Sequence, residues 1–367
     1  MEPYVPCWCL SGKKFKFCHF RRDEQEKVNF FELEARMNAE LRKGYCSVAG
    51  RTIDPCSGRI ARAHTVQRRG GLGLIADDQH VLTVKPIMKE MIEAEGKPEP
   101  RRIGVGQASV FPGFCGHHDT VLFKPIEGRQ LAIDVDMAFL FAYRAIAYES
   151  FAKEAQRRIM ELQRETDRGQ PFSKQVVIQQ LAHLQLAGIQ IGMRDGELWK
   201  AEFDARLTSG DRSGFHFVAV RFDALLPLVA ACAFHVEYDM AGNPLQRLGR
   251  DGGLLEHISV NVTAYEGETV AVFGWVGAAD GPAARLAQSF IDLPDERKAD
   301  GLLCLMLVQS DNIFMGPLWW DGLDADMKAE FIELIQAGLP SVSRTPGDYR
   351  LPQVPLLVAA VAELSRG

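Results

Sequence analysis

The chain has 367 residues, of which 47% are hydrophobic, and this length gives room for two or three globular domains. Its 42 lysines and arginines are outnumbered by 48 aspartates and glutamates, which argues against broad non-specific binding to nucleic acid. The sequence has no apolar run long enough to cross a membrane, and its N-terminus lacks a basic segment followed by an apolar core. We therefore expect a cytoplasmic protein without a membrane span or a secretory signal.

Both the charges and the cysteines are unevenly distributed along the chain. The first 130 residues carry 21 basic and 16 acidic side chains, whereas the remainder carries 21 basic and 32 acidic ones. Six of the eight cysteines also fall in the first third. Because clustered thiols in a reducing compartment more often bind metal than form disulfides, we expect a metal-binding N-terminal third. Its basic charge is compatible with contacts to DNA or RNA.

Four soft metal ligands lie within thirteen residues near the N-terminus, namely Cys7, Cys9, Cys18 and His19. They form a Cys-x-Cys pair and a Cys-His pair, with Ser-Gly and a basic run between the two pairs. Zinc prefers four thiolate or imidazole ligands in a tetrahedron, and so short a segment cannot build a hydrophobic core. Zinc binding would therefore supply the folding free energy of this segment.

The segment from Pro6 to Phe20 resembles the SEC-C motif, a small zinc knuckle best known from the C-terminus of the SecA translocation ATPase. The resemblance lies in the pattern Cys-x-Cys-x-Ser-Gly, followed after five residues by Cys-His. It implies that these three cysteines and His19 are zinc ligands, in a cytoplasmic bacterial protein. Leu10 stands where the family usually has glycine or another small residue, and this departure leaves the ligands unchanged. The motif occurs in many unrelated proteins, so it does not imply an activity.

Residues 23–43 are rich in charge and end at Gly44, which predicts a helix that links the knuckle to the next segment. Residues 45–127 are rich in glycine and have only short apolar runs, as expected of small strands around a metal. We therefore predict a knuckle over residues 1–22, a linker helix over 23–44 and a second zinc module over 45–130.

A second set of four zinc ligands is available in this module, from Cys46, Cys56, Cys115 and either His117 or His118. The two-residue gap between Cys115 and His118 is usual for a knuckle and favours His118. The 58 residues between Cys56 and Cys115 form a long loop, which a metal can close at a modest entropic cost. In the alternative interpretation, Cys46 and Cys56 are a chance pair of buried thiols.

The order of these parts resembles an HNH-type nuclease of the ββα-metal class with a structural zinc. The resemblance implies that His64, in the dipeptide Ala63-His64, is the general base that activates water. It also implies that Asp119 helps to hold a catalytic Mg or Mn ion. Three basic residues near His64 could bind the phosphate backbone, namely Arg62, Arg68 and Arg69.

The resemblance has a gap where the closing helix should carry a second histidine or asparagine. Phe123 and Lys124 stand at that spacing, and only His80 or Glu127 could substitute. A treble-clef zinc scaffold without nuclease activity is therefore the alternative. In that case His64 is a structural, hydrogen-bonding histidine or a metal ligand.

Apolar residues recur at helical spacing from Ile133 to about Arg168, where Gly169-Gln170-Pro171 interrupts the pattern. Ser173 is a candidate N-cap for a second helix that runs to about residue 192. Two long helices joined by a short loop predict an antiparallel hairpin over residues 131–200. We expect the charged residues near the loop, Asp167 among them, to be solvated.

Residues 201–367 predict an α+β body. Alternating apolar residues predict strands at 215–220, 233–238, 258–263 and 270–275, and a hairpin turn joins the last two. Helical spacing returns at 282–291, 295–309, 324–337 and 353–365.

The sequence as a whole predicts an α+β protein with a zinc knuckle, a treble-clef-like zinc module, a helical hairpin and a mainly antiparallel sheet with flanking helices. We expect zinc at one site and at a second, and Mg or Mn as well if the protein is a nuclease. One functional hypothesis is an HNH-like endonuclease, of the kind that serves as a defence effector against foreign or damaged DNA. The alternative is a non-catalytic adaptor whose zinc scaffolds dock a protein or nucleic-acid partner. The sequence leaves the oligomeric state open.

Overall fold

The computed structural model describes residues 2–50, 54–85, 99–128, 132–247, 253–338 and 344–367. The chain divides into two units, one formed by Met1–Tyr45 with Ser150–Leu198 and the other by Cys46–Glu149 with Trp199–Gly367. Two long helices, α5 (Val135–Gln163) and α6 (Phe172–Ser209), contribute residues to both units. The division into five segments remains a prediction.

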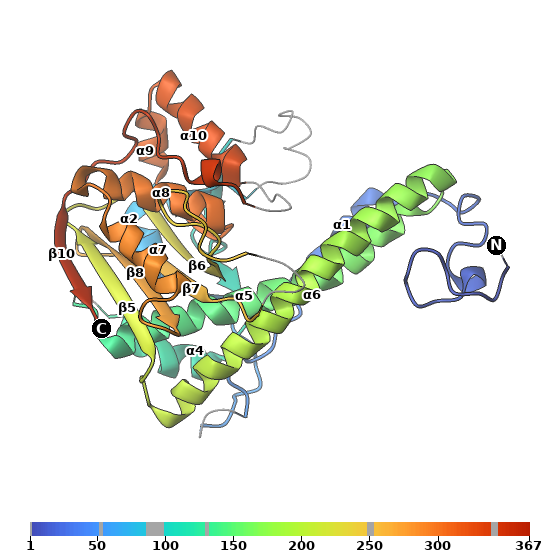
Figure 1. Cartoon of the computed structure of the whole chain (residues 1–367), viewed down its shortest axis with the longest axis horizontal. Coiled ribbons are helices and arrows are strands. Elements are labelled where there is room, and N and C mark those ends of the chain that lie inside the picture. Colours follow the sequence, from blue (N-terminus) through green and yellow to red (C-terminus); the bar gives the residue numbers. More distant parts are fainter. Residues whose placement is uncertain (1, 51–53, 86–98, 129–131, 248–252, 339–343) are drawn as a thin grey trace. The chain divides into compact units, whose positions relative to one another are not determined.

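The first unit is built on the helical hairpin of α5 and α6, which agrees with the sequence, although α6 extends further than expected. Helix α1 (Phe30–Glu40) runs beside the hairpin (Figure 1), and its Glu40 accepts a hydrogen bond of 3.1 Å from Arg158 of α5. α1 is shorter than the predicted linker helix because Asn29 caps its N-terminus, where the side chain accepts hydrogen bonds from the amides of Phe31 and Glu32.

Gly169 allows the sharp turn between the two hairpin helices. Its φ of 70° lies in the left-handed region, and a Cβ atom at this position would lie 2.6 Å from the carbonyl oxygen of Gln25. A short helical turn, η4 (Arg164–Asp167), joins α5 to this glycine. The hairpin turn therefore packs directly against the segment that follows the knuckle.

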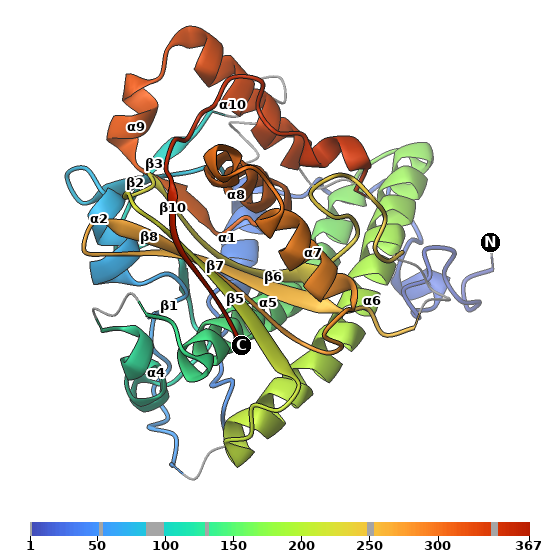
Figure 2. The same cartoon turned by 60° about the vertical axis from the view of Figure 1, so that its left-hand side comes forward.

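The second unit contains an eight-stranded sheet in which every pair of neighbouring strands is antiparallel, in the order β10-β5-β8-β7-β6-β9-β2-β3. The strands are β2 (His80–Thr83), β3 (Arg101–Gly104), β5 (Phe215–Phe222), β6 (Leu228–His235), β7 (His257–Tyr265), β8 (Glu268–Val276), β9 (Ile313–Met315) and β10 (Val361–Arg366). Figure 2 shows the twist of these strands across the sheet. The predicted α+β class with a mainly antiparallel sheet is confirmed.

The sheet is covered on both faces. Residues of β6 alternate between two hydrophobic clusters, with Leu228 and Ala230 in one and Val229 and Ala231 in the other. The first face carries α7 (Pro282–Ile291), α8 (Lys298–Gln309) and α10 (Ala325–Gly338), as Figure 1 shows, with α9 (Pro317–Gly322) next to them in sequence. Burial of both faces explains why the strands read as nearly continuous apolar runs.

The other face contacts η2 (Arg68–Leu72) and α2 (Gly73–Ile75), because Leu72 and Ile75 share a hydrophobic cluster with Val229 and Ala231 of β6. The segment over residues 45–130 also contains β1 (Ala63–His64), β4 (Val110–Phe111), α4 (Gly116–Phe123) and η3 (Lys124–Ile126). β1 and β4 form a separate two-stranded antiparallel sheet, and Cys115 directly precedes α4. Two further helical turns are η5 (Asp295–Arg297), which directly precedes α8, and η6 (Pro346–Tyr349), which precedes β10 in the sequence.

One predicted element is wrong. Residues 353–365 are not a helix, because Val361–Arg366 pairs with β5 as the edge strand β10. A strand at this edge satisfies backbone groups of β5 that would otherwise have no partner. In the described parts of the chain, no helix has the length and the apolar character needed to cross a bilayer.

Candidate metal centres

The N-terminal knuckle folds as two short loops held by backbone hydrogen bonds. The amide of Cys7 donates to the carbonyl of Lys13 over 2.8 Å, and the amide of Leu10 donates to the carbonyl of Cys7 over 3.1 Å. The second loop contains the helical turn η1 (Phe15–Phe17), and the amides of Cys18 and His19 both donate to the Phe15 carbonyl over 3.0 Å. These bonds bring the Cys-x-Cys pair opposite the Cys-His pair.

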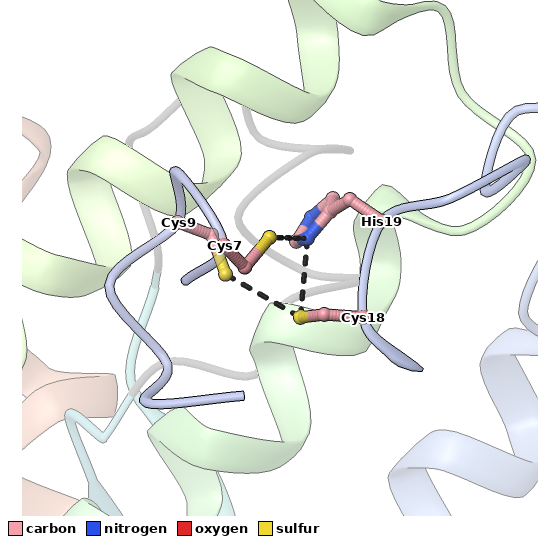
Figure 3. Close-up of side chains that lie close together, drawn as sticks. All are labelled: Cys7, Cys9, Cys18 and His19. Atoms are coloured by element: carbon pink, nitrogen blue, oxygen red, sulfur yellow. Dashed lines mark hydrogen bonds between the residues drawn. The ribbon is translucent and has the colours of Figure 1, made fainter. Parts of the chain in front are cut away.

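The four predicted ligands of this knuckle point toward one another (Figure 3), and we call them the knuckle cluster: Cys7, Cys9, Cys18 and His19. Their donor atoms all lie within 4.8 Å of one another. His19 Nδ1 is 3.2 Å from the sulfurs of both Cys7 and Cys18, and the sulfurs of Cys9 and Cys18 are 3.5 Å apart. Zinc bonded to sulfur and nitrogen in a tetrahedron gives ligand–ligand distances of about 3.5 to 3.8 Å. The cluster therefore fits a zinc ion.

The donor chemistry of the knuckle cluster also fits zinc. Its cysteines are free thiols. Burial raises the pKa of Cys7 to about 12. Burial acts in the same direction on Cys9, but hydrogen bonds from His19 and Ser11 prevail and lower its pKa to about 5. A bound divalent cation deprotonates the thiols that coordinate it, so both cysteines can act as thiolate ligands.

Asp167 lies directly behind His19, a predicted zinc ligand, and this contradicts our expectation that Asp167 is solvated. Its side chain is 0% exposed, and its Oδ2 is 2.7 Å from His19 Nε2. Although burial alone would raise the pKa of Asp167, hydrogen bonds from His19 and Arg22 hold it below its usual range. No spacing in the sequence could have revealed this contact, because 148 positions separate the two residues.

The second set of predicted ligands also converges, and we call it the second cluster: Cys46, Cys56, Cys115 and His118. These donor atoms likewise lie within 4.8 Å of one another. His118 Nδ1 is 3.4 Å from the Cys46 sulfur, 3.6 Å from that of Cys56 and 3.2 Å from that of Cys115. Three sulfurs and one imidazole again form a donor set that could bind zinc.

Backbone pairing places the ligands of the second cluster. The amide of Ser47, next to Cys46, donates to the Gly113 carbonyl over 2.8 Å, and Ile60 forms a bridge with Cys115. Cys115 then caps α4, so that His118 lies on the first turn of that helix. The result is a loop, a two-stranded sheet and a helix around one set of donors.

The imidazole of the second cluster belongs to His118, as the two-residue gap predicted. Its Nε2 is 3.2 Å from the backbone oxygen of Asp54, whereas the Nε2 of the neighbouring His117 is 3.8 Å from the Asp54 carboxylate. Burial acts to raise the pKa of Cys115, but hydrogen bonds from the His118 amide and Ser57 prevail and lower it to about 5. Desolvation and the neighbouring thiol of Cys46 raise the pKa of Cys56 to about 11.

The predicted catalytic residues His64 and Asp119 do not share a metal-binding group in the part of the chain that the structure describes. No group there with three or more carboxylate, thiol or imidazole donors includes either of them. Burial raises the pKa of Asp119, and Arg144 acts in the opposite direction. Glu127, which the sequence offered as a substitute ligand, accepts a hydrogen bond of 3.1 Å from Arg144.

His64 is half-buried in β1, and its carbonyl accepts a hydrogen bond of 2.9 Å from Arg144. Its ring nitrogen Nε2 is buried and has no hydrogen-bond partner. Burial lowers the pKa of His64, and the positive charges of Arg68 and Arg144 lower it further. The imidazole is therefore neutral at pH 7 and belongs to neither zinc-ligand cluster.

Comparison with known proteins supports the knuckle alone. A family model for the SEC-C motif matches residues 5–21, which include every ligand of the knuckle cluster. No curated protein and no solved structure matches the chain. The motif and the two clusters together indicate zinc binding.

Proposed function

We propose that this protein is a zinc-scaffolded adaptor, in which both zinc ions have a structural role. The observation that carries the proposal is the number of donors, because each cluster supplies four protein ligands. A catalytic zinc keeps one position open for water or substrate, whereas a structural zinc is enclosed by four protein ligands. Neither set leaves such a position.

The surface of the knuckle suits a docking role. Tyr4 and Phe17 are 61% and 70% exposed, although large aromatic side chains are usually buried. The Lys16 ammonium lies 5.0 Å from the centre of the Tyr4 ring, and Lys14 lies 5.8 Å from it. We infer that this basic and aromatic surface binds a protein partner that presents acidic and apolar side chains.

The docking role can be tested by charge reversal at the exposed lysines. The double variant Lys14→Glu/Lys16→Glu should retain both zinc ions and lose a partner that wild-type protein captures by in-cell crosslinking. Exposed basic residues of the other unit serve as a matched control, and Arg68→Glu/Arg69→Glu should retain that partner. Equal capture by both double variants and wild type would contradict the adaptor proposal.

The buried nitrogen of His64 favours a second candidate function, a metal-dependent nuclease. Arg144 is also buried, and its Nε and Nη2 have no hydrogen-bond partner. A neutral imidazole next to a guanidinium has the chemistry to activate water and to stabilise a phosphate. Among the residues that the structure describes, no group of three or more possible metal donors includes His64 or Asp119, so the cation site that the HNH resemblance implies is not seen there.

A plasmid-nicking assay with Mg or Mn tests the second candidate. If the protein is a nuclease, His64→Ala should abolish cleavage while His183→Ala, at an exposed position of α6, leaves it unchanged. If the zinc-loaded wild-type protein cleaves no plasmid with either Mg or Mn, the nuclease candidate is removed.

A further inference from the structure

A buried carboxylate on the hairpin turn contacts the knuckle cluster through its histidine. Asp167, with a side chain that is 0% exposed, accepts hydrogen bonds from three side chains. His19 Nε2 is 2.7 Å away, Gln179 Nε2 is 2.6 Å away and Arg22 Nε is 2.5 Å away. An ionised carboxylate is costly to bury, and this set of donors compensates for the lost hydration.

We propose that Asp167 is the positioning residue for the zinc ligand His19, so that the helical hairpin completes the metal site of the knuckle. The proposal rests on zinc binding by the knuckle cluster and goes beyond the SEC-C motif. That motif ends at residue 21, far from Asp167 in the sequence.

The chemistry of imidazole explains how Asp167 would act. A neutral imidazole carries one N–H, and an ionised carboxylate can only accept a hydrogen bond. The Asp167 oxygen therefore holds the proton on Nε2 and leaves the lone pair of Nδ1 free. That lone pair faces the sulfurs of Cys7 and Cys18, each 3.2 Å away. A carboxylate in this position fixes the orientation of the ring and increases its basicity toward the metal.

Further contacts hold the same turn against the knuckle. Arg164 Nη2 donates to the backbone oxygen of Cys9 over 2.8 Å, and the Gly169 amide donates to the carbonyl of Arg22 over 2.9 Å. The rings of Trp8 and Phe172 meet edge to face, with 5.4 Å between their centroids. These contacts fix the distance between Asp167 and His19, but they engage backbone groups and an aromatic side chain, not the donor atoms of the cluster.

The second cluster provides an internal comparison. There, His118 also presents Nδ1 to the sulfurs, while its Nε2 faces the backbone oxygen of Asp54 at 3.2 Å. A backbone carbonyl is a neutral acceptor and a carboxylate is a charged one, so the hydrogen bond at His19 is the stronger of the two. Loss of the carboxylate should therefore weaken zinc binding at the knuckle and leave the second cluster unchanged.

The test is a zinc competition titration with a colorimetric chelator on the full-length chain. Asp167→Asn should lower the binding affinity for one of the two zinc ions about 10- to 100-fold. That ion should be the one that Cys18→Ser loses. Glu165→Gln is the matched control, because Glu165 lies on the same turn and its carboxylate pairs with the half-exposed Arg36. It should bind zinc as wild type does.

A second variant separates positioning from simple loss of hairpin packing. Gln179→Met removes another donor to the same Asp167 oxygen without touching a metal ligand, so zinc affinity should be unchanged. Nitrogen-15 NMR of the zinc-loaded chain should show a proton on His19 Nε2 that exchanges slowly in wild type and rapidly in Asp167→Asn.

Two results would overturn the positioning role while leaving zinc binding intact. One is equal zinc affinity in Asp167→Asn and Glu165→Gln. The other is an equal loss in Asp167→Asn and Gln179→Met, which would assign the effect to folding of the hairpin. A wild-type chain that binds no zinc at the knuckle would instead overturn the proposed function together with this inference.

Discussion

Leu10 adopts an unfavourable backbone conformation inside the knuckle. Its φ is 60°, in the left-handed region that glycine occupies readily, and its side chain is 67% exposed. This conformation explains physically why the SEC-C pattern usually has a small residue here.

Leu10→Gly should relieve this backbone strain and make the free energy of zinc binding more favourable by roughly 0.5–1 kcal/mol, equivalent to about two- to fivefold tighter binding. A competition titration measures the gain, with Leu10→Ala as the control that retains the strain. Weaker binding by Leu10→Gly would show that the strain is absent.

His64 should titrate below its ordinary pKa of about 6.5, because burial and two arginines disfavour the imidazolium. The pKa of His64 is then lower in the folded state than in the unfolded chain. As the pH falls through the value of the unfolded chain, the folded state therefore binds fewer protons than the unfolded state. The free energy of unfolding should therefore decrease on acidification through this range, and His64→Gln should remove part of that decrease. An NMR titration of the His64 ring in native and urea-unfolded protein measures both pKa values. A native value at or above the unfolded one would refute this account of the environment of His64.

Ligands of the two clusters could be predicted from the sequence because zinc restricts both the residue types and their spacing. Asp167 could not be predicted. An aspartate within a charged run has the same sequence signature whether it is buried or solvated, and only the fold of the hairpin brings it to His19. The buried ring nitrogen of His64, which has no hydrogen-bond partner, could not be predicted either, since the burial of a side chain in a two-residue strand depends on tertiary packing.

Among the elements, α4 depends most directly on the second cluster. This helix has eight residues, too few for stability in isolation, and Cys115 and His118 attach its first turn to two distant loops. Cys46→Ser should therefore increase amide hydrogen exchange throughout α4. Cys232→Ser is the control, because Cys232 lies in the hydrophobic core and outside the clusters. Exchange in α4 that is unchanged by Cys46→Ser would contradict a structural role for the second cluster.

Most elements whose apolar residues recur at a regular spacing could be predicted, including the hairpin helices and the strands β7 and β8 with their turn. That turn has φ values of 50° at Glu266 and 89° at Gly267, as its sequence indicated. The C-terminal strand β10 could not be predicted. Its residues Val361–Arg366 are mostly exposed and have no strong alternation, so pairing with β5 decides their conformation.

At the scale of the whole molecule, the knuckle cluster and the helical hairpin belong to one unit, and the second cluster and the antiparallel sheet belong to the other. Removal of zinc by a chelator should therefore destabilise each unit locally without unfolding the sheet, whose core is built from apolar side chains. Circular dichroism and hydrogen exchange of the chelated protein measure this, and complete loss of strand protection would contradict it.

The central claim is that each cluster holds one structural zinc ion, and metal analysis of the purified protein tests it most directly. Wild-type protein should contain two zinc ions per chain, and Cys18→Ser and Cys46→Ser should each contain one. A wild-type chain with a single zinc ion that both variants retain would contradict the claim.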